Sequence, residues 1–427
     1  MGNILELDHV TKKSTEEGSS GKFHYAVSGM KGWRLAMEDC HTVCDAIPVD
    51  GYDKPLDDHL LFAVYDGHGG YLTSEYAGEN FIRILSKRPD LKSYVGLPHE
   101  GNKSRADVTG IDYLRNALKA TFRELDREVR ILQFRKNQEA ANNAISKARN
   151  EGKLNDTSQS HPPNRKVERS GSTCIAVLIT PSHIICANAG DSRAILRREG
   201  KAIPLSFDHK PSNLPELERI ISAGGFVKSK RIDGDLAVSR GLGDFTFKAQ
   251  PELPHHKQKV IHDPDFLVYP RDERNDEFIV LACDGVWDVA SNGQCSDMIQ
   301  AILDEGETDI SLVCEEVLDM CLERNSRDNM TLILVCFPGI KMDKLSNCSG
   351  SVVALRRASR RARILELHAK VAAENTARNM GMNLKLTSGY NSSKRDSSKA
   401  PPKQNDLQKP ALQSAEPQFL RPAQLVP

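Results

Sequence analysis

Several short apolar runs in this chain stop at, or just before, an aspartate. Apolar runs of this kind, bounded by glycine and aspartate, are typical of buried β-strands. Carboxylates at the ends of rigid strands can converge on one point, where they repel each other unless protons or a cation neutralise them. Oxygen ligands suit Mg²⁺ or Mn²⁺, so the pattern predicts a site for hard divalent metal ions. The runs and their acids are Leu60–Tyr65 with Asp66, Ile184–Ala187 with Asp191, Phe278–Cys283 with Asp284, and Thr331–Phe337 preceded by Asp328.

Charge is divided unevenly along the 427 residues. The chain as a whole has a formal net charge of zero, which argues against bulk binding of nucleic acid. Residues 340–427 hold 16 Lys and Arg against 6 Asp and Glu, a net charge of +10, so the remainder carries −10. We therefore expect an acidic body followed by a basic tail.

The cysteines and the N-terminus indicate where the protein works. None of the ten cysteines forms a CxxC pair, and most lie within apolar runs, as expected of buried thiols in a reducing compartment. There is no signal-peptide pattern and no apolar stretch long enough to span a bilayer. Gly2 is a candidate for myristoylation, although Glu6 stands where that motif has serine or threonine.

Hydrophobic spacing predicts the remaining elements. Residues 1–22 are expected to be a flexible lead, residues 87–110 a polar loop, and residues 150–170 a mobile segment rich in Asn, Ser and Pro. A basic amphipathic helix is expected near residues 352–373, followed by disorder from about residue 388. Helices are predicted over 72–86, 111–149, 214–223, 289–303 and 310–322, and further strands over 174–179, 183–187 and 194–196.

Two motifs near the first predicted acids carry further chemistry. Arg34 has a planar fork that matches phosphate or carboxylate oxygens, and Glu38 and Asp39 follow it closely. Taken alone, an ordinary surface salt bridge explains this group better. Gly67 permits a tight turn whose carbonyl can face a cation, and His68 beside it can donate a proton to a leaving group. Taken alone, that motif is also explained by a structural turn.

Seven blocks of sequence, in this order, resemble the signature of the metal-dependent protein phosphatases of type 2C, and they extend over roughly residues 23–339. The blocks are Gly32–Arg34 with Met37–Asp39, Phe62–Gly70, Ser170–Thr173, Asn188–Arg193, Leu236–Asp244, Ala282–Val289 and Ser326–Thr331.

The resemblance implies an α+β fold, a β-sandwich of two antiparallel sheets flanked by helices on both faces, with a basic helical and disordered C-terminal tail. It divides the chain into a lead over residues 1–22, a catalytic domain over 23–339 and a tail over 340–427. Residues 208–234 resemble the family's mobile flap, which tunes substrate choice.

The resemblance also implies a two-metal centre that holds Mn²⁺ or Mg²⁺. Asp66 would bridge the two ions. Glu38, Asp284 and Asp328 would complete the protein ligands of one ion, and the Gly67 carbonyl would bind the other.

Five further residues receive roles from the same resemblance. Asp39 would hold a metal-bound water from outside the ligand shell, and Asp191 and Asp288 would bind a weaker third ion. Arg34 would grip the substrate phosphate, and His68 would protonate the leaving seryl or threonyl oxygen.

The implied function is hydrolysis of phosphoserine and phosphothreonine in signalling proteins by a metal-activated water, without a covalent intermediate. The alternative is a pseudophosphatase that binds phosphoproteins as a scaffold; the complete set of acids, with Arg34 and His68, favours the enzyme. A metal-dependent nuclease would need a basic groove, which the negative body disfavours.

Partners and location follow as expectations. We expect phosphorylated serine/threonine proteins as substrates, no nucleic acid, and a monomer in the cytoplasm, with nuclear and peripheral membrane locations left open. The basic helix has three interpretations: docking on the acidic body, weak contact with anionic lipid together with an acylated Gly2, or a nuclear-import or partner segment.

Overall fold

A computed structural model describes residues 10–98, 107–150 and 167–340, and eight residues of the tail. Gly2, residues 151–166 and most of the tail, on which several predictions above fall, lie outside the described residues. The described tail residues are helical; they are Leu355, Arg356, Ala358, Ser359, Ala362, Arg363, Glu366 and Ala369.

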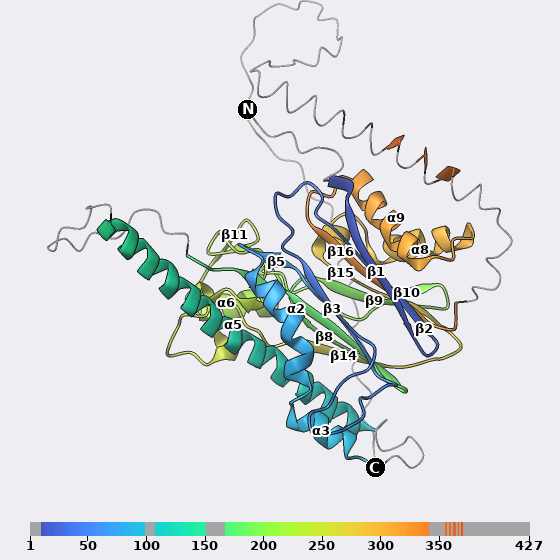
Figure 1. The fold of residues 1–427 in the computed structure, drawn as a ribbon, viewed down its shortest axis with the longest axis horizontal. Coiled ribbons are helices and arrows are strands. Elements are labelled where there is room, and N and C mark those ends of the chain that lie inside the picture. The colour runs from blue at the N-terminus through green and yellow to red at the C-terminus, as the bar shows by residue number, and fades with distance from the viewer. Residues whose placement is uncertain are drawn as a thin grey trace, which may run out of the picture. The chain divides into compact units, whose positions relative to one another are not determined.

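Two antiparallel sheets form the body of the molecule, which confirms the predicted fold class (Figure 1). The six-stranded sheet has the order β1 (Lys13–Ser20), β2 (Phe23–Met30), β16 (Met330–Cys336), β15 (Asp276–Ala282), β9 (Arg193–Arg198), β10 (Lys201–Pro204). The five-stranded sheet has the order β14 (Asp265–Pro270), β8 (His183–Ala189), β7 (Cys174–Ile179), β4 (Leu60–Tyr65), β3 (Cys40–Cys44). Two small sheets lie outside this pair: β13 (Leu242–Gly243), β6 (Gly171–Ser172), β5 (Gly67–His68), and β11 (Val227–Lys228), β12 (Arg231–Ile232).

Strand β4 shows why the central strands are apolar along their whole length. Successive side chains of a strand point to opposite faces of the sheet. Phe62 and Val64 belong to the core between the two sheets, whereas Leu61, Ala63 and Tyr65 pack in the core under the helices. Because both faces are covered, every residue of the strand is buried and no polar alternation appears.

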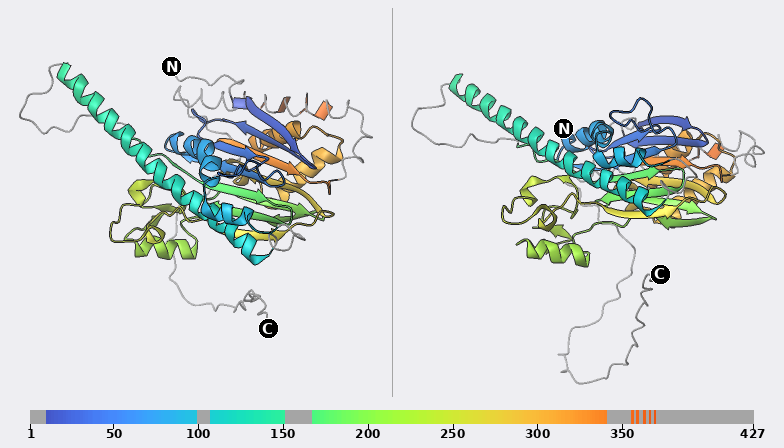
Figure 2. Two further views of the ribbon diagram at one scale, coloured as in Figure 1. Left: turned by 60° about the horizontal axis from the view of Figure 1, so that its bottom comes forward. Right: turned by 90° about the horizontal axis from the view of Figure 1, so that it is seen from below.

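Helices cover the outer face of each sheet (Figures 1 and 2). On the five-stranded sheet lie α2 (Leu72–Leu85), α3 (Pro89–Val95) and α5 (Val108–Asn150). On the six-stranded sheet lie α7 (Asp284–Trp287), α8 (Asn292–Asp304) and α9 (Ile310–Glu323). The chain between β10 of the six-stranded sheet and β14 of the five-stranded sheet contains α6 (Leu214–Ser222) and two 3₁₀ turns, η2 (Phe245–Phe247) and η3 (His255–Lys257). Within the described residues, no helix combines the length and apolarity needed to cross a membrane.

Three predictions about elements were wrong in part. Residues 13–20, expected in a flexible lead, form edge strand β1, whose pairing with β2 uses backbone groups and needs no apolar side chains. The expected loop 87–110 contains α3, which starts with Pro89, a favoured first helical residue. The helix expected from residue 289 begins at Asn292, because Ser291 and Gln294 form a capping box there.

Candidate active site

The turn between β4 and β5 places Asp66 at the mouth of the sandwich. The Asp66 N–H donates to Oγ1 of Thr173 over 3.1 Å, and the Thr173 N–H donates to the Asp66 carbonyl over 2.9 Å. A Cβ at Gly67 would lie 2.2 Å from the carbonyl oxygen of Glu38, so only glycine lets these two segments approach. The backbone on both sides of Asp66 is therefore fixed.

Acids from distant parts of the chain meet at Asp66. One ligand atom each from Asp66, Asp191 and Asp284 lies within 4.8 Å of the others, and the same is true of Asp66, Asp39 and Cys283. Asp191 comes from the turn between β8 and β9, and Asp284 starts α7 directly after β15. Asp66 is the one residue that the two groups share.

Burial and mutual repulsion make it unfavourable for all carboxyl groups of this cluster to be ionised at the same time. Burial raises the pKa of Asp66 well above its ordinary value, and the charges of Asp284 and Asp39 raise it further. Burial, followed by the charges of Asp191 and Asp288, raises the pKa of Asp284 to about 8. These pKa values stay raised although the cation Lys210 opposes the shift at Asp191 and Asp284, so the positive charge present does not neutralise the crowded carboxylates. A divalent cation with oxygen ligands supplies such charge, so the residues present fit a hard metal ion.

Cys283 does not join these ligands, although its sulfur lies close to Asp66. Burial raises the pKa of its thiol well above the ordinary value. The thiol donates to the Asn329 carbonyl over 3.4 Å and accepts from the Thr331 N–H over 3.2 Å. A neutral thiol bound in this way is a poor ligand for a hard ion.

Asp39 is held beside the cluster by hydrogen bonds. Thr331 Oγ1 donates to Asp39 Oδ2 over 2.8 Å. Burial raises the pKa of Asp39 to about 6, and the hydrogen bond from Thr331 opposes that rise. A carboxyl group with this pKa can take up or release a proton near neutral pH.

The predicted ligands Glu38 and Asp328 lie at the edge of the cluster. Arg34 Nη2 donates to Asp328 Oδ2 over 2.6 Å, and neither Glu38 nor Asp328 belongs to the two close groups. The charge of Asp328 nevertheless raises the pKa values of Asp66 and Asp284. The structure thus brings Asp328 near the acids, but it pairs the carboxylate with Arg34.

Asn329 connects these two segments through its side-chain amide. Its Oδ1 accepts from the Glu38 N–H over 2.9 Å, and its Nδ2 donates to the carbonyls of Lys31 and Ala36 over 2.9 and 3.0 Å. One amide side chain therefore fixes the loop that carries Arg34 and Glu38 against the segment that carries Asp328.

His68 has a partner that the sequence motifs did not identify. Its Nε2 lies 2.9 Å from both carboxylate oxygens of Asp244. A Cβ at Gly171 would lie 2.4 Å from that Nε2 and 2.2 Å from Asp244 Oδ2, so glycine makes room for the pair. Burial opposes protonation of His68, but the Asp244 carboxylate outweighs it and the pKa is raised. Asp244 ends the block Leu236–Asp244, and its left-handed φ of 52° is a backbone feature that sequence alone does not reveal.

Asp191 and Asp288, the residues predicted for a third ion, have different surroundings. Asp191 is bonded to Lys210 Nζ, a partner that the sequence reading did not name. Asp288 is exposed, and its N–H donates to the Asp284 carbonyl over 2.8 Å. Its charge raises the pKa of Asp284, but it belongs to neither close group.

Comparisons with known proteins show which family the sequence and the fold resemble. The sequence model described as Protein phosphatase 2C matches residues 23–130 and 98–330. Protein phosphatase 1A of Homo sapiens is 36% identical over 338 residues, which cover 79% of this chain and 76% of that protein. Protein phosphatase 1B of Rattus norvegicus is 37% identical over 343 residues, which cover 79% and 76%. A solved phosphatase from Toxoplasma gondii has a TM-score of 0.55 at 25% identity and covers 76% of this chain and 96% of that one.

Proposed function

This chain belongs to the protein phosphatase 2C family, and from that premise we propose how its own residues remove phosphate from phosphoserine and phosphothreonine. The family is one of metal-dependent serine/threonine protein phosphatases. The observation that carries the proposal is the convergence of Asp66, Asp191 and Asp284, with pKa values raised for all three.

We propose Mn²⁺ or Mg²⁺ as the ions of the centre. Asp66 would be shared between two of these ions. Asp284 and the edge acids Glu38 and Asp328 would be ligands of one ion, and the Gly67 carbonyl would be a ligand of the other. When bound, such ions lower the pKa of water and neutralise charge on phosphoryl oxygens. Asp191 and Asp288 remain our candidates for a third, weaker site.

Arg34 is the residue that we propose to bind the substrate phosphate. Its side chain is 56% exposed and its only strong partner among the described residues is Asp328. A planar guanidinium binds two oxygens of a phosphate at once. Arg34 would thus hold the phosphoryl group and stabilise the charge that spreads over its oxygens.

His68 and Asp39 are the residues that we propose to handle protons. In the protonated ring of His68, the Nε2–H faces Asp244. The second N–H, on Nδ1, would then donate its proton to the leaving seryl or threonyl oxygen. Asp39 would orient the attacking water and accept a hydrogen bond from it. Neither step uses a cysteine or serine nucleophile, so no phosphoenzyme is expected.

Hydrolysis of p-nitrophenyl phosphate and of a phosphothreonine peptide tests the proposal directly. We expect turnover with Mn²⁺ or Mg²⁺ and loss of turnover when EDTA removes the metal. Calorimetric titration would show separately whether the protein binds the ion. A protein that binds Mn²⁺ and a phosphopeptide but does not hydrolyse either substrate would support the pseudophosphatase alternative instead.

A further inference from the structure

Two imidazoles and a carboxylate meet beside helix α5, in the segment between the flap and β14. His255 lies in η3, and His262 and Asp263 follow shortly before β14. One ligand atom from each of these side chains lies within 4.8 Å of the other two. None of the three belongs to the acidic cluster around Asp66, so they form a separate group.

The two ring nitrogens of His262 have different surroundings. The residue is only 6% exposed, and its Nδ1 lies 3.3 Å from Oδ2 of Asp126. Burial opposes ionisation of Asp126, but Lys248 and His262 outweigh it and lower the Asp126 pKa to about 2. In the neutral form of His262, the form that binds metal, an ionised Asp126 holds the ring proton on Nδ1 and leaves the lone pair on Nε2. Among the described residues, Nε2 has no hydrogen-bond partner.

Asp263 presents a second buried acceptor at the same place. Its Oδ2 also has no hydrogen-bond partner among the described residues, and it lies 3.6 Å from Nε2 of His255. The rings of His255 and His262 are stacked, with centroids 5.2 Å apart and an interplanar angle of 12°. Burial, followed by His262 and Arg123, lowers the pKa of His255 against the opposing charge of Asp263. A neutral imidazole is the form that binds metal.

We propose that His255, His262 and Asp263 bind a divalent transition-metal ion such as Zn²⁺ at a second site, distinct from the catalytic ions. Buried acceptors without donors are costly, and a cation placed between them satisfies both. Two imidazole nitrogens and one carboxylate oxygen suit Zn²⁺ better than Mg²⁺. Asp126 would orient His262 as outer carboxylates commonly do for zinc-binding histidines.

The three ligand atoms need to move only a short distance toward one another to bind the ion. In a tetrahedral zinc site, Zn–N distances of about 2.0–2.1 Å separate the ligand atoms by about 3.4 Å. Here the three ligand atoms lie within 4.8 Å of one another. His255 is exposed, and it lies in a short 3₁₀ turn, so its side chain is the one free to move inward. The adjoining pocket of about 300 Å³ leaves room for a water as the fourth ligand.

Two cations line the same pocket and oppose metal binding. Lys119 Nζ lies 3.8 Å from Oδ1 of Asp263, and Arg123 lies one helical turn further along α5. Both side chains are exposed, so water and salt screen their charges. Lys119 faces Oδ1 and leaves Oδ2, the buried acceptor, for the ion.

Equilibrium dialysis of the full chain against Zn²⁺, with Mg²⁺ in excess, tests the proposal, with bound zinc measured by elemental analysis. All proteins would carry Asp66→Asn, so that zinc at the catalytic centre is not counted. We expect the His255→Ala and Asp263→Asn changes to weaken zinc binding more than about tenfold. The neighbouring exposed His256, which is not in the group, provides the matched control His256→Ala, and we expect it to bind zinc normally.

His262→Ala is a further variant, but His262 is buried and its replacement also removes the contact with Asp126. The exposed His255 therefore decides the outcome. Absence of bound zinc in the Asp66→Asn protein would overturn the proposal, as would equal zinc affinity with and without the His255→Ala change. Phosphatase activity is not the readout, so this result does not depend on the catalytic assignment.

Discussion

Among single side chains, Asp244 gives a prediction about the pH dependence of catalysis. His68 protonates the leaving group in our proposal, so activity requires its protonated form, which is lost as pH rises through the His68 pKa. Asp244 raises that pKa against the effect of burial. The Asp244→Asn change removes the charge and leaves the burial, so the His68 pKa should fall.

We therefore expect Asp244→Asn to move the basic limb of the kcat–pH profile to lower pH. At alkaline pH its kcat should approach that of His68→Gln, a loss of about 100-fold or more, with a smaller loss at acid pH. The exposed turn residue Asp235 gives the control Asp235→Asn, whose profile should match the unchanged enzyme. If Asp244→Asn lowered kcat by the same factor at every pH and did not shift the basic limb, the proposed role of the His68–Asp244 pair would be contradicted.

The shared carboxylate and its neighbour give the second prediction at this scale. Asp66→Asn and Asp284→Asn should each lower kcat by several orders of magnitude, because each removes an ionic metal ligand. Their circular dichroism should be unchanged, because removing one of several crowded carboxyl groups relieves repulsion. Asp53→Asn, at an exposed turn, should keep full activity. Near-normal turnover in either site variant would disprove the metal assignment.

Sequence patterns predicted the acids of the centre well and their partners poorly. Asp66, Asp191 and Asp284 follow apolar runs, and an acid at a strand end is visible in the sequence. Lys210 and Asp244 lie in loops, where no periodicity relates them to the acids or to His68. Their positions depend on how the loops fold back, and so only the structure revealed these pairs.

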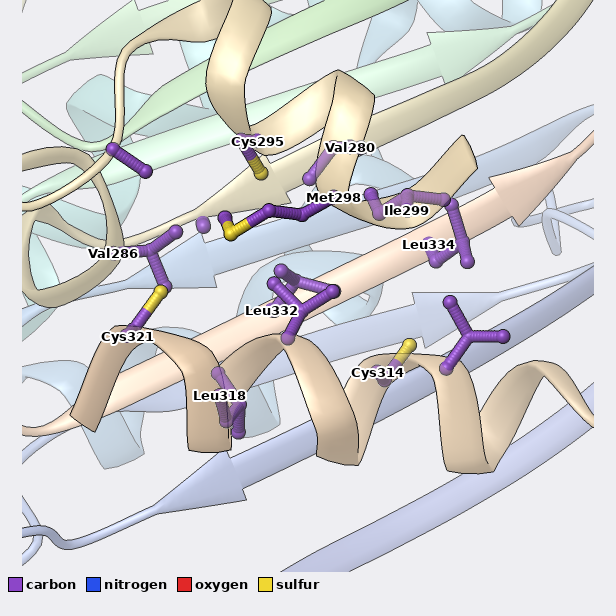
Figure 3. Close-up of a cluster of buried hydrophobic side chains, with 14 of the residues drawn as sticks. Val280, Val286, Cys295, Met298, Ile299, Cys314, Leu318, Cys321, Leu332 and Leu334 are labelled. Atoms are coloured by element: carbon purple, nitrogen blue, oxygen red, sulfur yellow. The ribbon is translucent and has the colours of Figure 1, made fainter. Parts of the chain in front are cut away.

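At the level of helices and strands, packing between α9 and the six-stranded sheet holds one outer layer in place. Figure 3 shows Leu318, Cys314 and Cys321 on α9 facing Leu332 and Leu334 of β16. Leu318 is fully buried. The layer depends on apolar contacts of this kind, since α9 meets the sheet through side chains rather than backbone hydrogen bonds.

We expect Leu318→Ala to lower the free energy of unfolding by about 2–5 kcal/mol, through lost burial and the cavity that remains. Urea denaturation followed by circular dichroism measures the change. Leu214→Ala, in which the replaced side chain is 67% exposed, should change stability by less than about 0.5 kcal/mol. Equal effects of the two changes would show that α9 does not depend on this core.

Elements with strong periodicity were predicted correctly, and elements that depend on local backbone chemistry were missed. The long α5 shows a regular apolar stripe, and its predicted and observed ranges nearly coincide. Strand β1 is half exposed and polar, so only its hydrogen bonds to β2 identify it. The start of α8 depends on the capping box at Ser291, which hydrophobic spacing does not register.

For the molecule as a whole, the acidic centre links stability to pH and to metal. Raised pKa values in the folded state, about 6 for Asp39 and about 8 for Asp284, mean that the metal-free fold binds protons more tightly than the unfolded chain. Proton binding therefore stabilises the metal-free fold. Its contribution to the free energy of unfolding is complete below the ordinary aspartate pKa and is lost as pH rises through the pKa values of the folded state. Metal ions replace the missing protons.

We therefore expect the rise in Tm on adding Mg²⁺ to EDTA-treated protein to be larger at about pH 8.5 than at about pH 5. Differential scanning fluorimetry at both pH values measures this difference. The Asp66→Asn, Asp284→Asn double variant should show little response at either pH. An equal rise at both pH values in the unchanged protein would mean that protons and metal do not compete at these carboxylates.

The uneven charge of the chain also has a structural counterpart. Arg356 binds Glu316 through two hydrogen bonds of 2.9 and 3.0 Å and also contacts Glu305. Arg363 Nε lies 3.3 Å from Oε1 of Glu323. At these described residues the basic tail meets acids on α9 and just after the end of α8, in agreement with docking on the acidic body, one of the three interpretations of this segment.

The ion pair between Arg34 and Asp328 has a thermodynamic consequence for the binding of metal and substrate. While the pair is closed, each partner satisfies the other, and neither is fully available to an external ligand. In our proposal, a cation bound by Asp328 would release the guanidinium, and a phosphate bound by Arg34 would release the carboxylate. Each ligand must then increase the affinity for the other by the same factor. Scarce metal would therefore weaken substrate capture as well as slow turnover.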